Sequence, residues 1–234
     1  MKKRIKSVGL ICAITLIIAF TAACSSLDVI GQKSIPAFDT ILQTIPDQIT
    51  VDELNGGWSL AAPDNSVRFI WSKDYSESPL YDIMLEIDAT PFIKAGLDPK
   101  KLPDNYTFYD NKLLVGTKLG NDASTDEEQS SPLASFEQIV DKYRKTIGYH
   151  TALDHYNVSL LDGNMFEWAK DLEKNTVSGE AQDKDIVFVL NPDSLIEAGV
   201  NPDEVEGWVY TTVNDGMSGK ATNVYKFLKP FDLK

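Results

Sequence analysis

The chain has 234 residues, of which 43% are hydrophobic, which is enough to bury a core as one or two domains. It carries 35 acidic and 22 basic residues, a formal net charge of −13. Because nucleic acids and anionic membranes bind clustered Lys and Arg, this charge argues against a nucleic-acid partner and against broad contact with such a membrane.

Residues 1–23 have the pattern of a secretory signal. Four basic residues among the first six precede an apolar run from Val8 to Phe20, and small residues follow it. The run is short for a membrane-spanning helix, which needs roughly 20 apolar residues. We therefore expect export of the chain and removal of this segment.

Ala22, Ala23 and Cys24 match the lipobox that ends bacterial lipoprotein signals. The signal resembles that of this family, although Thr21 stands where a leucine-like residue is usual. The resemblance implies lipidation of Cys24 and a protein anchored by lipid to the extracytoplasmic face of a bacterial membrane. Ordinary cleavage that leaves a free thiol is the alternative. The only other cysteine, Cys12, lies in the signal, so the mature chain has no intramolecular disulfide and no metal site built from cysteines.

After the signal, residues 24–34 are expected to form a short polar tether. Apolar residues then recur with a helical period from Pro36 to Ile45, which predicts an amphipathic helix. Residues 58–61 and 67–72 lie between turns that contain Gly and Pro, and both stretches are predicted to be strands.

The chain contains one unit twice. Three motifs recur in the same order: Phe-x-Trp-x-Lys-Asp at Phe69 and Phe166, Asp-Ile at Asp82 and Asp185, and Ile-x-Ala-Gly at Ile93 and Ile196. We interpret residues 35–120 and 133–234 as a tandem duplication of a unit of about 100 residues, joined by an acidic linker at 121–132. A longer loop at residues 172–184 accounts for the change in offset between the copies. The predicted fold class is α+β, with a mixed or antiparallel sheet and short helices.

Each unit has the same predicted local structure. A strand is expected at residues 82–87 and 185–190, half-buried in the first unit and covered on both faces in the second. Asp88 and Asn191 can cap the short helix that follows. Gly96 and Gly199 are expected to close this helix in the left-handed conformation. Further strands are predicted at residues 106–109 and 208–213.

The second unit has features that the first lacks. Its opening helix is predicted to be longer, with apolar residues from Phe136 to Ile147, and the loop at 172–184 is longer. Change confined to one copy can reflect a specialised role or simple drift. We place the candidate ligand site at His150, His155 and Tyr156, facing the junction between the units, where clefts often bind ligands.

The two histidines are the only ones in the chain. On a continuous helix His150 and Asp154 would share a face, and imidazole with carboxylate suits zinc-like ions. A structural or surface role is the alternative. Trp71 and Trp168 could stack on a sugar or peptide, but a shared packing role in both units is favoured. The acidic linker lacks the glycine and glutamate of a calcium loop, and is therefore interpreted as a solvated linker.

Two functional classes remain open. The favoured class is a non-enzymatic binding or accessory lipoprotein that recognises a small molecule, an envelope polymer or an envelope protein, without a cofactor. The alternative is an envelope hydrolase or metal-dependent enzyme centred on His150, Asp154 and His155. The first is favoured because the sequence has no Gly-x-Ser-x-Gly elbow, phosphate loop, Gly-x-Gly-x-x-Gly or His-Glu-x-x-His motif.

Overall fold

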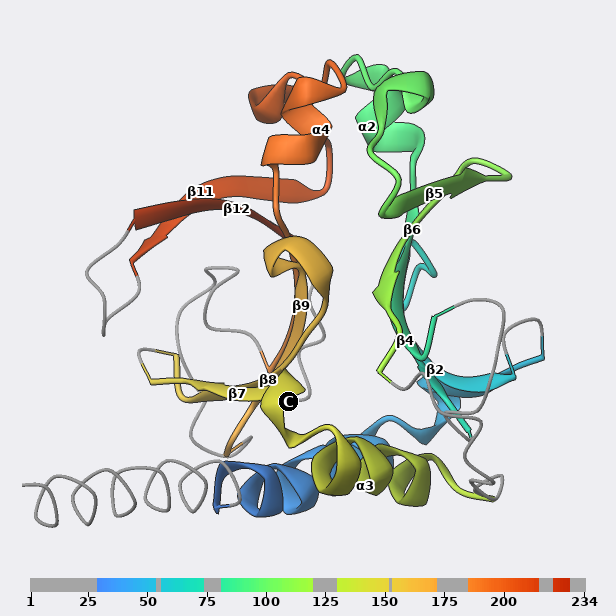
Figure 1. Ribbon diagram of the computed structural model, residues 1–234, viewed down its shortest axis with the longest axis vertical. Coiled ribbons are helices and arrows are strands. Elements are labelled where there is room, and N and C mark those ends of the chain that lie inside the picture. The colour runs from blue at the N-terminus through green and yellow to red at the C-terminus, as the bar shows by residue number, and fades with distance from the viewer. Residues whose placement is uncertain are drawn as a thin grey trace, which may run out of the picture.

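The computed structural model describes residues 29–53, 56–73, 81–119, 130–151, 153–171, 185–214 and 221–227. Two antiparallel six-stranded sheets face each other, and two helices close one end of the space between them (Figure 1). These helices and sheets confirm the predicted α+β class. The signal with Cys24, most of the acidic linker and the loop at 172–184 lie outside the described residues.

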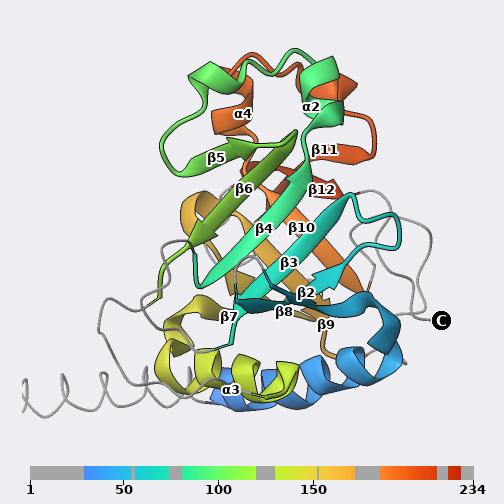
Figure 2. The same cartoon turned by 90° about the vertical axis from the view of Figure 1, so that its right-hand side faces the viewer.

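The first unit forms one sheet in the order β1-β2-β3-β4-β6-β5, and every neighbouring pair is antiparallel (Figure 2). Its strands are β1 (Ile49–Asp52), β2 (Gly57–Ala61), β3 (Val67–Ser72), β4 (Ile83–Asp88), β5 (Tyr106–Tyr109) and β6 (Lys112–Thr117). The strands predicted at 58–61, 67–72 and 106–109 are therefore confirmed.

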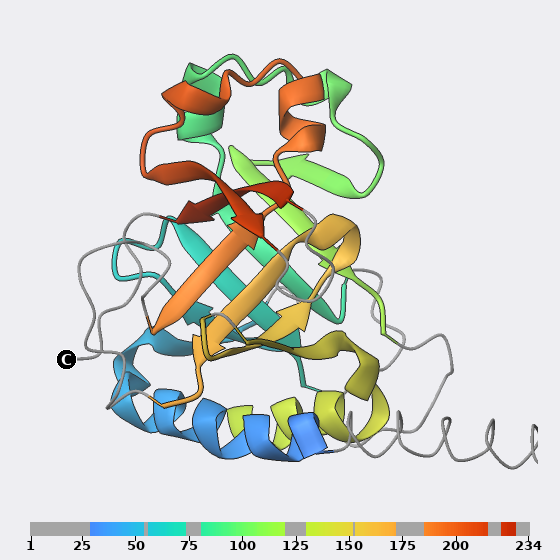
Figure 3. The same ribbon diagram turned by 90° about the vertical axis from the view of Figure 1, so that its left-hand side faces the viewer.

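The second unit forms the other sheet, in the order β7-β8-β9-β10-β12-β11 (Figure 3). Its strands are β7 (Ile147–His150), β8 (His155–Ser159), β9 (Met165–Ala169), β10 (Ile186–Leu190), β11 (Trp208–Asn214) and β12 (Ala221–Phe227). The strand order is the same in both sheets. Duplication of an ancestral unit stays an interpretation of this likeness.

The prediction that the strand at 82–87 is half-buried is wrong. Ile83, Met84 and Leu85 are all fully buried, so β4 is covered on both faces. Its polar residue Glu86 is buried beside Arg68, whose guanidinium donates two hydrogen bonds of 3.1 and 2.7 Å to the carboxylate. The polar residue in the alternating pattern of β4 therefore marks an ion pair on the outer face of the sheet, where the partly exposed Arg68 covers Glu86.

The two helices that close the molecule at one end differ in length from the predictions. The first covers residues 29–44, so residues 29–34 of the expected tether are helical. The second, α3 (Pro132–Lys142), begins at Ser131, whose side chain accepts a hydrogen bond from the N–H of Ala134. It ends before Tyr143, because the chain turns through η3 (Arg144–Thr146) into β7. The prediction of a longer helix through Ile147 is therefore wrong.

Short helices α2 (Thr90–Lys94) and α4 (Asp193–Glu197) lie at the opposite end of the molecule (Figure 1). Asp88 and Asn191 accept hydrogen bonds of 2.9 and 3.0 Å from the first backbone N–H groups of these helices. Gly96 and Gly199 end them with φ of +105° and +106°. The predicted caps and glycine turns are confirmed. Matching 3-10 turns follow, η2 (Pro99–Lys101) and η6 (Pro202–Glu204), with η1 (Pro46–Gln48) and η4 (Leu161–Gly163) elsewhere in the chain.

One continuous core joins the two units. The rings of Phe69 and Phe166 stack 4.4 Å apart across the space between the sheets. Those of Phe38 and Phe136 stack 3.9 Å apart beneath them, where the two long helices meet. Each pair occupies corresponding positions of the two units, as in the self-complementary interface of a symmetric dimer. The two units therefore bury their apolar faces against each other.

The two tryptophans of the repeated motif belong to this core. Trp71 and Trp168 are both fully buried, and Trp71 Nε1 donates a 3.1 Å hydrogen bond to the carbonyl oxygen of Pro132. Neither indole ring is therefore accessible to a sugar or peptide. The packing role predicted for these residues agrees with their burial.

Candidate functional site

His150 and His155 are brought together by the hairpin of β7 and β8, where they lie opposite each other. The continuous helix on which His150 and Asp154 would share a face does not form, because the chain turns between strands β7 and β8. Glu167 on β9 lies near both: its carboxylate oxygens are 3.4 Å from His150 Nδ1 and 3.8 Å from His155 Nδ1. Nothing in the sequence spacing indicated that Glu167 would join the histidines.

Side chains alternate between the two faces of a strand, and Phe166 and Trp168 on either side of Glu167 face the core. The Glu167 side chain therefore points away from the core. Nevertheless, Glu167 is only 2% exposed and His155 is fully buried. Burial raises the pKa of Glu167, but the two neighbouring imidazoles lower it more, to about 2. Glu167 therefore stays ionised, and the two imidazoles compensate the cost of burying its charge.

Tyr156 does not share this position. It follows His155 in the same strand, so its side chain points to the opposite face, where it packs against Trp168 with ring centroids 6.0 Å apart. The structure thus separates Tyr156 from the histidines. The predicted orientation is also wrong for His155, which lies on the face turned away from the junction.

Asp154 is also separated from the histidines. Its carboxylate accepts a hydrogen bond from the Tyr149 hydroxyl and lies 3.4 Å from Lys170 Nζ. No ion pair in the described residues joins it to His150 or His155. The predicted constellation of His150, Asp154 and His155 is therefore not assembled, and among the described residues no group of three or more His, Cys, Asp or Glu is placed to hold a metal ion.

The first sheet has a comparable cluster on its outer face. Glu86 is held by Arg68 and by Lys112, whose Nζ lies 2.9 Å from the carboxylate. Burial raises the pKa of Glu86, but these two cations lower it more. Since each sheet compensates one buried glutamate with cationic or ionisable neighbours, a structural role explains the histidine cluster as well.

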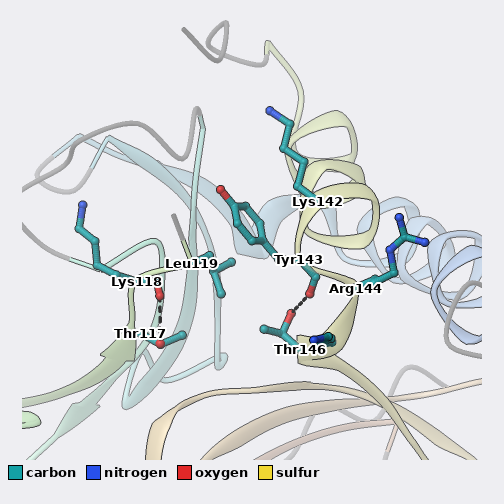
Figure 4. A pocket seen from close by; sticks show the side chains of 8 residues that line it. Thr117, Lys118, Leu119, Lys142, Tyr143, Arg144 and Thr146 are labelled. Carbon is teal, nitrogen blue, oxygen red and sulfur yellow. Dashed lines mark hydrogen bonds between the residues drawn. The ribbon is translucent and has the colours of Figure 1, made fainter. Parts of the chain in front are cut away.

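A pocket of about 730 Å³ lies at the junction of the two units. One side is formed by the end of β6 and the residues after it, Thr117 to Leu119, and the other by the α3–β7 connection, Lys142 to Thr146 (Figure 4). Leu119 and Tyr143 are partly buried against the core and form its apolar wall. The pocket thus combines residues from both units.

Hydrogen bonds to backbone groups hold both walls of this pocket in place. The N–H of Leu119 donates to the buried carboxylate of Asp82. Tyr143 N donates a 2.8 Å hydrogen bond to Ile139 O, which ends α3, and Tyr143 O accepts one of 2.8 Å from Thr146 Oγ1 (Figure 4). These hydrogen bonds therefore fix the two connecting segments that form the walls of the pocket.

The pocket is strongly basic although the chain is acidic. Of the eight described residues that line it, four are cationic and none is acidic: Lys118, Lys142, Arg144 and Lys145. All four are exposed, and Asp141 is the acidic residue next to them on α3. In Figure 4, Tyr143 projects between the segments that carry Lys118 and Lys142. The cationic side chains point in different directions, with Arg144 directed away from Lys118 (Figure 4). Basic residues gathered around a pocket can nevertheless attract an anionic ligand.

Sequence reasoning missed this pocket. Three cations within four residues, Lys142 to Lys145, are visible in the sequence and are unusual in so acidic a chain. The contribution of Lys118 depends on the way the two units pack.

No known protein family, curated protein or solved structure matches the chain. In the described part of the chain, no helix has both the length and the apolar character required to span a membrane.

Proposed function

We propose that this chain is a lipid-anchored, extracytoplasmic binding or accessory protein rather than an enzyme. The observation that carries the proposal is the basic pocket between Leu119 and Tyr143, which residues of both units form. Ligand sites commonly lie in such clefts between packed units. The lipobox at Cys24 supports the anchor and the extracytoplasmic location.

The anchor can be tested in a bacterial host. Full-length protein should partition with membranes, because several acyl chains hold a protein to a bilayer far more firmly than one. Mass spectrometry should find lipid on Cys24. Cys24→Ala should be released or mislocalised. A mature N-terminus without lipid would contradict the proposal.

The binding role can be tested by a thermal-shift screen of the mature chain against sugars, peptides, metal ions and anions. A specific ligand should raise the melting temperature because it binds only the folded state. Tyr143→Ser should abolish the shift, whereas His150→Gln should preserve it, because His150 does not line the pocket. If His150→Gln abolished the shift and Tyr143→Ser preserved it, the ligand would bind at the histidines and not in the pocket.

An enzyme centred on the histidines has less support. Asp154, the carboxylate expected there, contacts Tyr149 and Lys170 instead. Glu167 takes its place, but His155 beside it is fully buried. A general acid or base must reach its substrate within hydrogen-bond distance, directly or through one water.

A further inference from the structure

The basic pocket lies at the end of the molecule from which the chain leads back to Cys24. The first described turn of the N-terminal helix packs against the end of α3: a Cβ on Gly31 would lie 2.8 Å from Val140 Cγ1. The pocket residues Lys142 to Thr146 follow Val140 directly. Figure 1 shows these helices at one end of the molecule and α2 and α4 at the other.

The anchor keeps this end near the bilayer. Five residue steps separate Cys24 from the first described helical residue, position 29. Even a fully extended segment of this length spans at most about 18 Å. A lipid on Cys24 would thus hold the pocket within a short distance of the phospholipid headgroups.

The composition of the pocket matches the chemistry of a phospholipid headgroup. An arginine side chain can bind phosphate oxygens with two parallel hydrogen bonds, and Arg144 lines the pocket together with Lys142 and Lys145, which add positive charge. Leu119 and Tyr143 offer an apolar wall next to these cations. Basic residues next to the membrane attract anionic lipids over about one Debye length, so the charge acts locally even though the whole chain is acidic.

We propose that the junction pocket binds the phosphate of an anionic phospholipid headgroup in the membrane that holds the anchor. This inference rests on the proposed function and specifies its ligand. It also gives the pocket a second role, because headgroup binding would fix the orientation of the protein on the bilayer. Free phosphate shares the same chemistry and is the competing source of the ligand.

The test uses the mature chain from residue 25, which lacks the lipid and retains every described residue. Its binding is measured to vesicles of phosphatidylcholine alone and to vesicles that also contain phosphatidylglycerol. The pocket variant is Lys118→Gln/Lys142→Gln/Lys145→Gln. The control variant, Lys94→Gln/Lys100→Gln/Lys101→Gln, removes the same charge from exposed positions around α2 and η2 at the opposite end.

The wild type should bind the anionic vesicles, and added salt should weaken binding. The pocket variant should bind at least about tenfold more weakly, since each lost Lys removes one attraction to the surface, and the control variant should bind like wild type. Equal loss in both variants would show non-specific attraction and overturn the proposal. So would an absence of binding to anionic vesicles.

A competition arm separates the two sources of phosphate. Inorganic phosphate should displace the wild type only weakly at the ionic strength of a matched chloride control. If phosphate bound tightly to the wild type and not to the pocket variant, while vesicles did not bind, the ligand would be free phosphate and the membrane role would be wrong. None of these measurements needs the lipid anchor on Cys24, so their outcome is independent of the test of that anchor.

Discussion

Gly96 and Gly199 lie against each other where the two units meet, just after the ends of α2 and α4. A Cβ on Gly96 would lie 2.7 Å from the carbonyl oxygen of Gly199, and the reciprocal distance is 2.8 Å. On either side, Asp98 N donates to Ala198 O and Asn201 N donates to Ala95 O, at 2.9 and 2.7 Å. The contact therefore has no room for a side chain at either glycine.

Gly199→Ala should destabilise the protein for two reasons. A residue with a Cβ at positive φ costs about 1–2 kcal/mol, and the new methyl group would also push against the Gly96 carbonyl. Gly207→Ala is the matched control, because Gly207 also has a positive φ, +87°, but a Cβ added there would meet nothing within 4 Å. Urea unfolding should show a larger loss for Gly199→Ala, and equal losses would mean that the contact contributes nothing.

The stacked rings of Phe69 and Phe166 predict that the two units unfold together. Each Phe→Ala substitution should cost about 3–5 kcal/mol, because it leaves a cavity in the shared core. A double-mutant cycle should give a coupling of about 0.5–1.5 kcal/mol, the usual range for an aromatic pair. Circular dichroism and tryptophan fluorescence should report one common urea transition. Two separate transitions would contradict a single core.

Glu167→Gln should reduce the dependence of stability on acid pH. The pKa of Glu167 is lowered from 4.5 to about 2 in the folded state, so its ionised form stabilises the fold above about pH 4.5. That contribution, of the order of 3 kcal/mol, is lost as the pH falls from 4.5 towards 2. The free energy of unfolding should therefore fall less steeply from pH 5 to pH 3 in the variant than in the wild type.

Glu204→Gln is the control for this experiment, because Glu204 is exposed in η6. It should retain the acid dependence of the wild type. If Glu167→Gln also retained it, the coupling between Glu167 and the two histidines would be too weak to matter for stability.

The sequence predicted local structure well wherever a short motif determines it. Asp88 and Asn191 cap their helices, and Gly96 and Gly199 end them, because the interactions involve neighbouring residues. The end of α3 was predicted wrongly because the apolar pattern of the sequence continues past it. Ile147 continues the apolar pattern of the helix, but it belongs to strand β7, and its side chain enters the core from that strand.

The sites could not be predicted because they depend on register and on packing between the units. Glu167 meets the histidines only because β8 pairs with β9 in a particular register. Tyr156 is separated from His155 by the alternation of side chains in the same strand. Lys118 joins the basic residues after α3 only when the two sheets have packed face to face.

The strand order has a consequence for the kinetics of folding. Each sheet is built from strands close in the sequence, and no described ladder pairs a strand of one sheet with a strand of the other. Hairpins can therefore nucleate early at little cost in loop closure. Burial of Phe69 against Phe166 must await the docking of two preformed sheets. Stopped-flow fluorescence of the buried tryptophans would follow this step, during which the chain still exposes the apolar faces of both sheets.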